Sequence, residues 1–200
     1  MACEFSGTVR RAFGALGHDA WSCDLLDDED GSRQHFKGDV REMLDHGWDL
    51  MIAHPPFTHL AVSGARWFKD KQADQAEALE FVRTLMDAPV RRIAIENPVS
   101  IISSRIRKPD QIIQPWQFGH GETKATCLWL RGLPLLRPSE VVSGREQKVF
   151  RMAPGPNRKR LRSMTFEGIA RAMAVQWGSV TNHGSKPETH LGNVTLRRAA

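Results

Sequence analysis

Leu50-Met51-Ile52-Ala53, an apolar run, leads directly into the tetrad His54-Pro55-Pro56-Phe57. The apolar run is typical of a buried strand, and two successive prolines end a strand because each lacks an N–H and fixes φ. In open α/β sheets, ligands bind beyond the carboxyl ends of the strands. The tetrad therefore predicts a rigid turn at a ligand-binding sheet edge. An ordinary exit from a strand is the simpler alternative.

Strand and helix patterns alternate on both sides of this turn. Apolar residues at helical spacing predict helices at 9–16, 40–44, 73–86 and 166–177. Short apolar runs predict strands at 20–24, 48–53, 92–95 and 125–130. The segment 111–121, rich in Pro, Gly, Trp and Gln, is expected to be a functional loop. The alternation predicts an α/β fold with a mostly parallel sheet and helices on both faces.

Length, charge and cysteine content narrow the class of protein. A chain of 200 residues suits one domain, expected at 1–178, and the polar stretch 179–200 is expected to be a disordered tail. The net charge of +5 suits a polyanionic partner. Three cysteines without metal-ligand spacing indicate neither a disulfide framework nor a metal site. Without a signal segment or a membrane-length apolar stretch, a cytoplasmic protein with no membrane partner is expected.

The first part of the chain carries a pattern suited to a cofactor with an adenosine end. Such a cofactor needs a close backbone turn and then, about 20 residues later, an acid for the ribose hydroxyls. Ser6-Gly7 is a candidate for the turn, Asp24 ends the next predicted strand, and Asp39 ends the one after it. A solvated loop carboxylate at Asp24 and a helix N-cap at Asp39 are the alternatives.

Several separated motifs occur in one order along the chain. Ala2-Cys3-Glu4-Phe5-Ser6-Gly7 opens it, His54-Pro55-Pro56 follows, and Glu96-Asn97-Pro98 ends another predicted strand. A run from Gln114-Pro115-Trp116 to Leu130 and the final helix, 168–177, complete the series. In this order the motifs resemble those of small phage and prophage proteins related to DNA cytosine-5 methyltransferases. The resemblance covers residues 2 to about 178.

The resemblance implies a Rossmann-like fold that binds S-adenosylmethionine and acts on DNA. Asp24 would then hold the ribose hydroxyls, Asp39 would face the adenine, and Glu96 would grip the target base. A structural Glu96 that caps nearby backbone is the alternative. The residues assigned to the cofactor are Glu4, Phe5, Ser6, Gly7, Asp24 and Asp39, and those assigned to catalysis are His54, Pro55, Pro56, Phe57, Glu96 and Asn97.

The chain departs from the family pattern at its reactive position. The residue after Pro56 should be the nucleophilic cysteine, but it is Phe57, and no other thiol in the sequence obviously replaces it. Three interpretations remain open: a catalytically inactive DNA-binding relic, chemistry by an unspecified route, or an amino-methyltransferase. In the last, His54 would accept an amine proton and Phe57 would stack on an extruded base.

A basic stretch lies late in the chain, within the segment 133–163, where larger DNA methyltransferases carry a target-recognition domain. It would contact DNA phosphates without strong sequence specificity, and a solubilising loop is the alternative. Trp67 and Trp116 are candidates for base stacking, whereas Trp129 is expected in the core. The basic residues are Arg145, Lys148, Arg151, Arg158, Lys159, Arg160 and Arg162.

Overall fold

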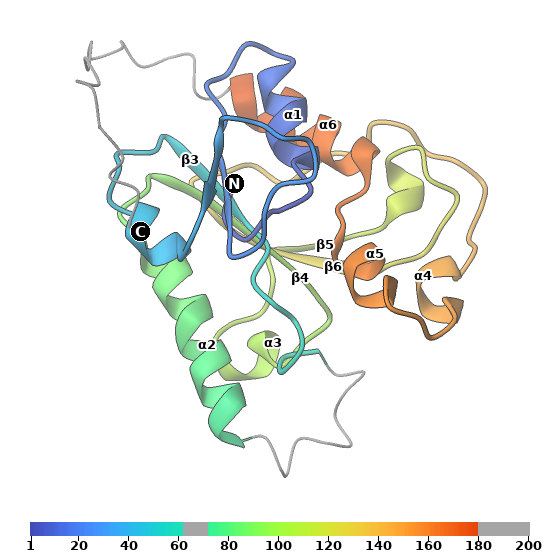
Figure 1. The fold of residues 1–200 in the computed structure, drawn as a ribbon. Helices are drawn as coiled ribbons and strands as arrows, with labels where there is room; N and C mark the ends of the chain where they lie inside the picture. Colours follow the sequence, from blue (N-terminus) through green and yellow to red (C-terminus); the bar gives the residue numbers. More distant parts are fainter. Residues whose placement is uncertain (62–71, 180–200) are drawn as a thin grey trace.

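The computed structural model describes residues 1–61 and 72–179, and shows an α/β fold with a mixed sheet (Figure 1). Trp67 and the predicted tail beyond residue 179 lie outside the described residues. In chain order the elements are α1 (Thr8–Gly14), β1 (Ser22–Asp24), β2 (His35–Lys37), the 3-10 helix η1 (Val40–Met43), β3 (Leu50–Ala53), α2 (Gln72–Asp87), β4 (Arg92–Pro98), α3 (Ile102–Arg105), β5 (Gln111–Ile113), the 3-10 helix η3 (Pro115–Gln117), β6 (Thr126–Arg131), α4 (Lys148–Arg151), α5 (Arg158–Ser163) and α6 (Glu167–Gly178).

The first four residues join the two groups of strands. The strand orders are β1-β2 and β3-β4-β6-β5, and Ala2 forms parallel bridges to both Cys23 of β1 and Ala53 of β3. The Ala2 N–H donates to Ile52 O at 2.8 Å, and the His54 N–H donates to Ala2 O at 2.9 Å. Ala2 therefore takes the place of a full central strand in a sheet with the order β2-β1-Ala2-β3-β4-β6-β5.

The sheet is not mostly parallel, and that prediction is wrong. β1 pairs with β2 and β3 pairs with β4 in parallel, but β6 is antiparallel to both β4 and β5. Because β6 lies between β4 and β5, this one reversed strand makes both of its ladders antiparallel. A hydrophobic run predicts a strand but carries no information on its direction, so the sequence pattern at 125–130 could not reveal the reversal.

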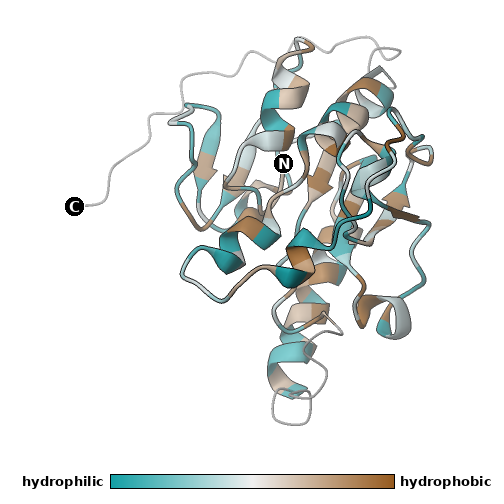
Figure 2. Ribbon diagram, turned by 90° about the vertical axis from the view of Figure 1, so that its right-hand side faces the viewer, coloured by the Kyte–Doolittle hydropathy of each residue, from teal (hydrophilic) through white to brown (hydrophobic). Residues whose placement is uncertain are grey.

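Helices cover both faces of the sheet, as predicted. Alternate residues of β4 point to opposite faces: Ile93 and Ile95 belong to the core with α2, and Ala94 belongs to the core with α1 and α6. This is the period-two alternation of a strand buried on both sides. Figure 2 shows hydrophobic residues along the strands and helices that carry both hydrophobic and hydrophilic surfaces.

The expected loop 111–121 is wrong in its first half, which contains β5 and η3. Residues 111–113 form a strand because they pair with β6, and the Gln111 side chain also pairs with the backbone of Leu136. It donates to Leu136 O at 2.7 Å and accepts from Leu136 N at 2.8 Å. The Gln111 amide thus makes both hydrogen bonds to Leu136 at the outer edge of β5. Ile113 of the same strand is fully buried.

Ala76 and Val175, two apolar residues within the predicted helices 73–86 and 166–177, are exposed. Ala76 is exposed because it lies in the first half of α2, which extends past the sheet in Figure 1. Val175 of α6 is 59 % exposed, although its neighbours Ala174 and Trp177 are buried. In both helices the buried stripe is narrower than the apolar pattern of the sequence.

We predict that Ala2→Pro lowers the free energy of unfolding by about 1–3 kcal/mol. Proline has no N–H, so Ile52 O would be left buried and unpaired. Urea unfolding followed by circular dichroism measures the change. Ala2→Gly keeps the N–H and should cost only about 0.5–1 kcal/mol. Equal losses in the two variants would contradict the role assigned to this hydrogen bond.

Candidate functional site

A cavity of about 740 Å³ opens at the edge of the sheet where β1, β3 and β4 end. Its wall comes from the turn after Ala2, the ends of these three strands, the residues just before β6, and α5 with the residues after it. Ten of the predicted cofactor and catalytic residues line it: Glu4, Phe5, Ser6, Asp24, His54, Pro55, Pro56, Phe57, Glu96 and Asn97.

The turn after Ala2 is held in place by a buried carboxylate. Glu4 accepts the N–H of Val9 at 2.6 Å and that of Arg10 at 3.2 Å, so it satisfies two backbone donors at the start of α1. Gly7 has φ 64°, and a Cβ there would approach the Arg10 guanidinium to 2.5 Å. The turn therefore needs glycine at this position, although Gly7 itself is not among the residues that line the cavity. Among the described residues, Cys3 is the one non-glycine with positive φ, at 58°.

Asp24 and Asp39 occupy different surroundings. Asp24 lines the cavity at the end of β1, and its pKa is raised because burial disfavours its charge more than the hydrogen bond from the Leu26 N–H favours it. Asp39 lies outside the lining and caps η1 through the Arg41 N–H at 2.9 Å. The Arg41 guanidinium also bonds this carboxylate and lowers its pKa. Asp39 thus makes the N-cap contact that the sequence offers as the alternative.

His54 and Glu96 form a buried pair in the cavity wall. His54 Nδ1 lies 2.9 Å from Glu96 Oε2, and the two side chains are 8 % and 10 % exposed. Burial by itself raises the pKa of the Glu96 carboxyl, but the hydrogen bond from His54 and the charge of Lys124 outweigh it, and the pKa is lowered. Glu96 is therefore ionised at neutral pH. The other ring nitrogen, His54 Nε2, is buried with no hydrogen-bond partner.

The Pro-Pro turn is tied to the neighbouring strand by Asn97. Its Nδ2 donates to Pro55 O at 2.8 Å, and its Oδ1 is buried without a partner. Asn97 is 1 % exposed, so the turn is fixed from inside the molecule. Phe57 follows on the cavity wall and is half-buried.

The three cysteines are poor nucleophiles. Burial raises the pKa of the Cys3 thiol to about 12 and that of Cys23 to about 11. Burial also raises the pKa of Cys127, which lies inside β6. Since the thiolate is the reactive form, all three are protonated and inert near neutral pH. Cys3 is the cysteine that lines the cavity.

The basic residues predicted to contact DNA divide into two groups. Arg160 and Arg162 line the cavity on α5, and Arg160 donates to Glu29 at 2.5 Å across it. On the same helix, which also contains Lys159, Arg158 Nε donates to Met152 O at 2.9 Å. The predicted basic loop thus contains two short helices, and both contribute to the cavity wall, α4 through Val149 and α5 through Arg160 and Arg162.

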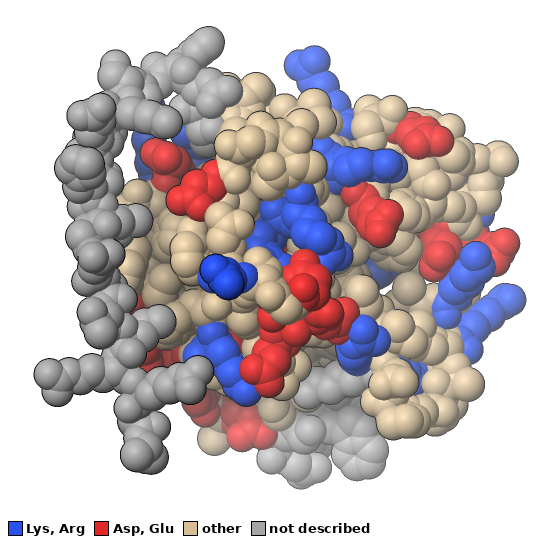
Figure 3. Space-filling model, turned by 45° about the horizontal axis from the view of Figure 1, so that its top comes forward, with Lys and Arg blue, Asp and Glu red and all other residues tan. Residues whose placement is uncertain are grey.

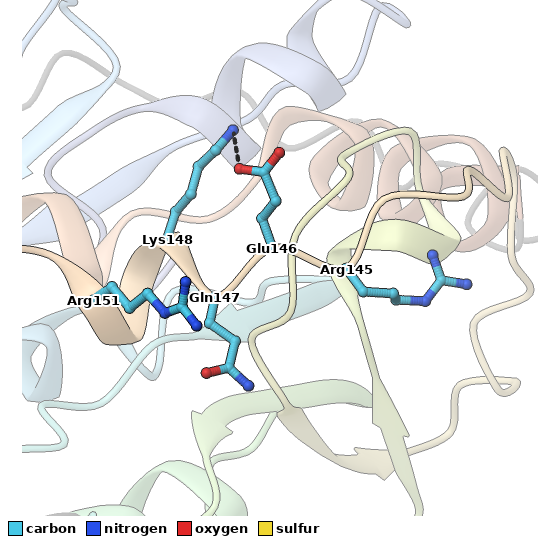
Figure 4. Close-up of a pocket in the computed structure, with 5 residues that line it drawn as sticks. All are labelled: Arg145, Glu146, Gln147, Lys148 and Arg151. Carbon is cyan, nitrogen blue, oxygen red and sulfur yellow. Dashed lines mark ion pairs between the residues drawn. The ribbon is translucent and has the colours of Figure 1, made fainter.

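The second group lines a separate cavity of about 610 Å³ (Figure 4). Arg145, Lys148 and Arg151 lie there with Glu146 and Gln147. Lys148 pairs with Glu146 at 3.5 Å, and the Arg145 guanidinium lies 3.8 Å from the centre of the Trp116 ring. Arg145 and Trp116 therefore stack on each other.

Sequence reasoning missed Lys124 and the residues around α5 as parts of the wall. Burial lowers the pKa of the Lys124 ammonium, whose Nζ donates to Met164 O at 3.2 Å. Lys124 follows the Pro- and Gly-rich run, and its position just before β6 was the available signal. Ser163 and Met164 sit in sequence that lacks periodicity, so nothing in the pattern placed them at the cavity.

Two comparisons with known proteins gave no match. No family model matches the chain, and a search of curated proteins gives no significant match. In the described residues, no helix is both long and apolar enough to cross a bilayer. Residues 1–61 and 72–179 also contain no group of three or more His, Cys, Asp or Glu side chains able to hold a metal ion.

We predict that iodoacetamide modifies Cys3 very slowly in the folded protein. At pH 9 a thiol with the ordinary pKa of 9.0 is half ionised, whereas Cys3, with a pKa of about 12, is ionised in roughly one molecule in a thousand. Mass spectrometry of timed samples gives the rate. Protein unfolded in guanidinium is the control, because its thiols should react at ordinary rates. Fast alkylation of folded Cys3 at pH 7 would mean that the cavity does contain an activated thiol.

Proposed function

We propose that the cavity binds S-adenosylmethionine and an extruded DNA base, in a protein of the DNA methyltransferase type. The observation that carries the proposal is the convergence of residues from four separate segments on one cavity. Residues 3–6, Asp24, residues 54–57 and residues 96–97 all line it. Its volume of about 740 Å³ falls in the usual range for sites that hold a nucleoside-sized ligand.

The chain path supports a Rossmann-like placement of the cofactor. From Ala2 the chain builds β1 and β2 on one side, and then crosses to build β3 and β4 on the other. The carboxyl edge at such a reversal of strand order is where open α/β sheets bind nucleotides. Under the proposal, the rigid turn at Glu4 to Ser6 approaches the cofactor, and the Asp24 carboxylate accepts hydrogen bonds from its ribose hydroxyls. When bound, the cofactor supplies an electrophilic methyl group.

The opposite wall supports a nucleobase beside the cofactor. Phe57 offers a ring for stacking, and enzymes that modify a base must first remove it from the duplex. Arg160 and Arg162 would neutralise phosphates on the same side, which gives affinity with little sequence preference. Acidic and basic side chains alternate on the face in Figure 3, so any DNA contact there is local and not a continuous basic surface.

A catalytically silent DNA-binding protein is the second candidate. It is favoured by Phe57 at the position where the resembling family has its nucleophile, together with the protonated state of Cys3. Both candidates retain the cofactor site, so cofactor binding and methyl transfer have to be measured separately.

We predict that Asp24→Ala weakens S-adenosylmethionine binding by about 1–3 kcal/mol, the scale of lost hydrogen bonds to a charged group. Isothermal titration calorimetry measures the change. Asp45→Ala, which removes an exposed carboxylate outside the cavity lining, is the matched control and should leave the affinity unchanged. Unchanged affinity in Asp24→Ala would show that the cofactor does not lie where we propose.

The function itself is tested by methyl transfer from labelled S-adenosylmethionine to genomic DNA, followed by digestion to nucleosides. We expect label in a methylated base. Phe57→Cys places a thiol beside the base and tests whether the nucleophile alone is enough to give 5-methylcytosine, with Phe57→Ser as its control. Cofactor binding without any labelled base would favour the silent candidate. Absence of cofactor binding would overturn the proposed function.

A further inference from the structure

We infer that His54 and Glu96 act as a proton-accepting pair for the exocyclic amine of a nucleobase. This inference rests on the proposed function. It specifies which atom receives the methyl group, namely the amino nitrogen of adenine or cytosine and not ring carbon C5. His54 is the catalytic residue, and Glu96 is a positioning residue that acts through it.

The hydrogen bond between the two side chains fixes the role of each ring nitrogen. The ionised Glu96 carboxylate can only accept, so His54 Nδ1 at 2.9 Å carries the hydrogen. In the neutral ring the lone pair is then on Nε2. That nitrogen is buried and unpaired in a side chain that lines the cavity. A buried acceptor without a partner is unfavourable, which makes it a position where a ligand N–H gains a hydrogen bond.

A second unpaired acceptor belongs to the same wall. Asn97 Oδ1 is buried without a partner, while its Nδ2 is held by Pro55 O. An exocyclic amine has two N–H groups, and the wall therefore offers two vacant acceptors to it, His54 Nε2 and Asn97 Oδ1. Cytosine C5 also has to lose a proton, but only after a thiolate has added to C6, so these two acceptors alone are not enough for C5 methylation.

The cavity lacks the two groups that methylation at cytosine C5 uses, a thiolate and a proton donor for N3. Attack on cytosine C6 needs a thiolate, but position 57 is Phe and the Cys3 thiol is protonated. That attack is also helped by a proton donor at N3, and an ionised Glu96 bonded to His54 cannot donate one. Both observations favour the amine as the methyl acceptor.

The proton balance of amine methylation matches what the pair provides. The amine nitrogen forms a bond to the methyl carbon as the carbon–sulfur bond breaks, and the bonding electrons return to the sulfonium sulfur. The nitrogen then carries an excess proton, which passes to His54 Nε2. The resulting imidazolium lies against the Glu96 carboxylate, whose negative charge stabilises it, and later loses the proton to water.

The test combines labelled transfer to oligonucleotides with a direct measurement on the ring. We expect label in N6-methyladenine or N4-methylcytosine, and separate oligonucleotides that lack adenine or lack cytosine identify which. His54→Gln should lower kcat on the order of 10²- to 10⁴-fold, the usual contribution of general base catalysis, while cofactor affinity by calorimetry stays within about threefold. Imidazole ¹⁵N spectra of the wild-type protein should show the hydrogen of His54 on Nδ1.

Two further variants distinguish a loss of catalysis from a loss of folding. Glu96→Gln keeps an acceptor for Nδ1–H but removes the negative charge, so kcat should fall at least about tenfold with KM unchanged. His46→Gln, at an exposed histidine, is the matched control and should retain wild-type rates.

Three results overturn the inference. Label in 5-methylcytosine from wild-type protein would do so while leaving the proposed function intact, as would wild-type kcat in Glu96→Gln. Cofactor binding with no labelled base would remove the inference and favour the silent candidate. Failure to bind the cofactor would instead remove the proposed function on which the inference rests.

Discussion

The backbone hydrogen bonds of residues 1–4 hold the two groups of strands together, and the rest of the molecule depends on them. Ala2 is 2 % exposed and lies between β1 and β3. Its own backbone bonds go to Ile52 and His54, while Met1 O and Glu4 N bond to Cys23 of β1. The Ala2 carbonyl accepts the His54 N–H, and the turn that follows it carries Glu4 into the cavity wall. The position of β1 and of the turn at Glu4 relative to the Pro-Pro turn is thus set by the same short stretch that completes the sheet.

Two buried contacts then give the cavity its chemical character. Asn97 holds Pro55, and Glu96 holds His54, so adjacent residues of β4 fix adjacent parts of the turn after β3. A buried pair of this kind is costly to desolvate and is weak evidence for stability. The pair lies beside an unpaired ring nitrogen in the cavity wall, so its contribution is to the chemistry of the cavity more than to the stability of the fold.

Much of the fold and of the site could be predicted from particular residues. The apolar run 50–53 and the prolines after it predict the end of one strand, and Glu96-Asn97-Pro98 predicts the end of another. Because these two strands are parallel neighbours, their ends meet at one edge of the sheet. The direction of β6, the pairing of Gln111 with Leu136, and the return of α5 to the cavity could not be predicted. These depend on contacts between segments distant in sequence, which leave no local periodicity. The bond between His54 and Glu96 is of the same kind.

The reversal of β6 has a consequence for how the protein could diversify. Because this strand starts at the cavity edge, beside Lys124, it ends at the opposite edge, where Gly132 lies against the backbone of Arg91. The chain must therefore travel back across the molecule before α5 can cover the cavity. Leu136 on this path is buried and its backbone pairs with the Gln111 side chain of β5, so only a change of length after Leu136 would leave these contacts with the sheet in place. Such a change would move α5 relative to the strand ends that form the rest of the cavity wall.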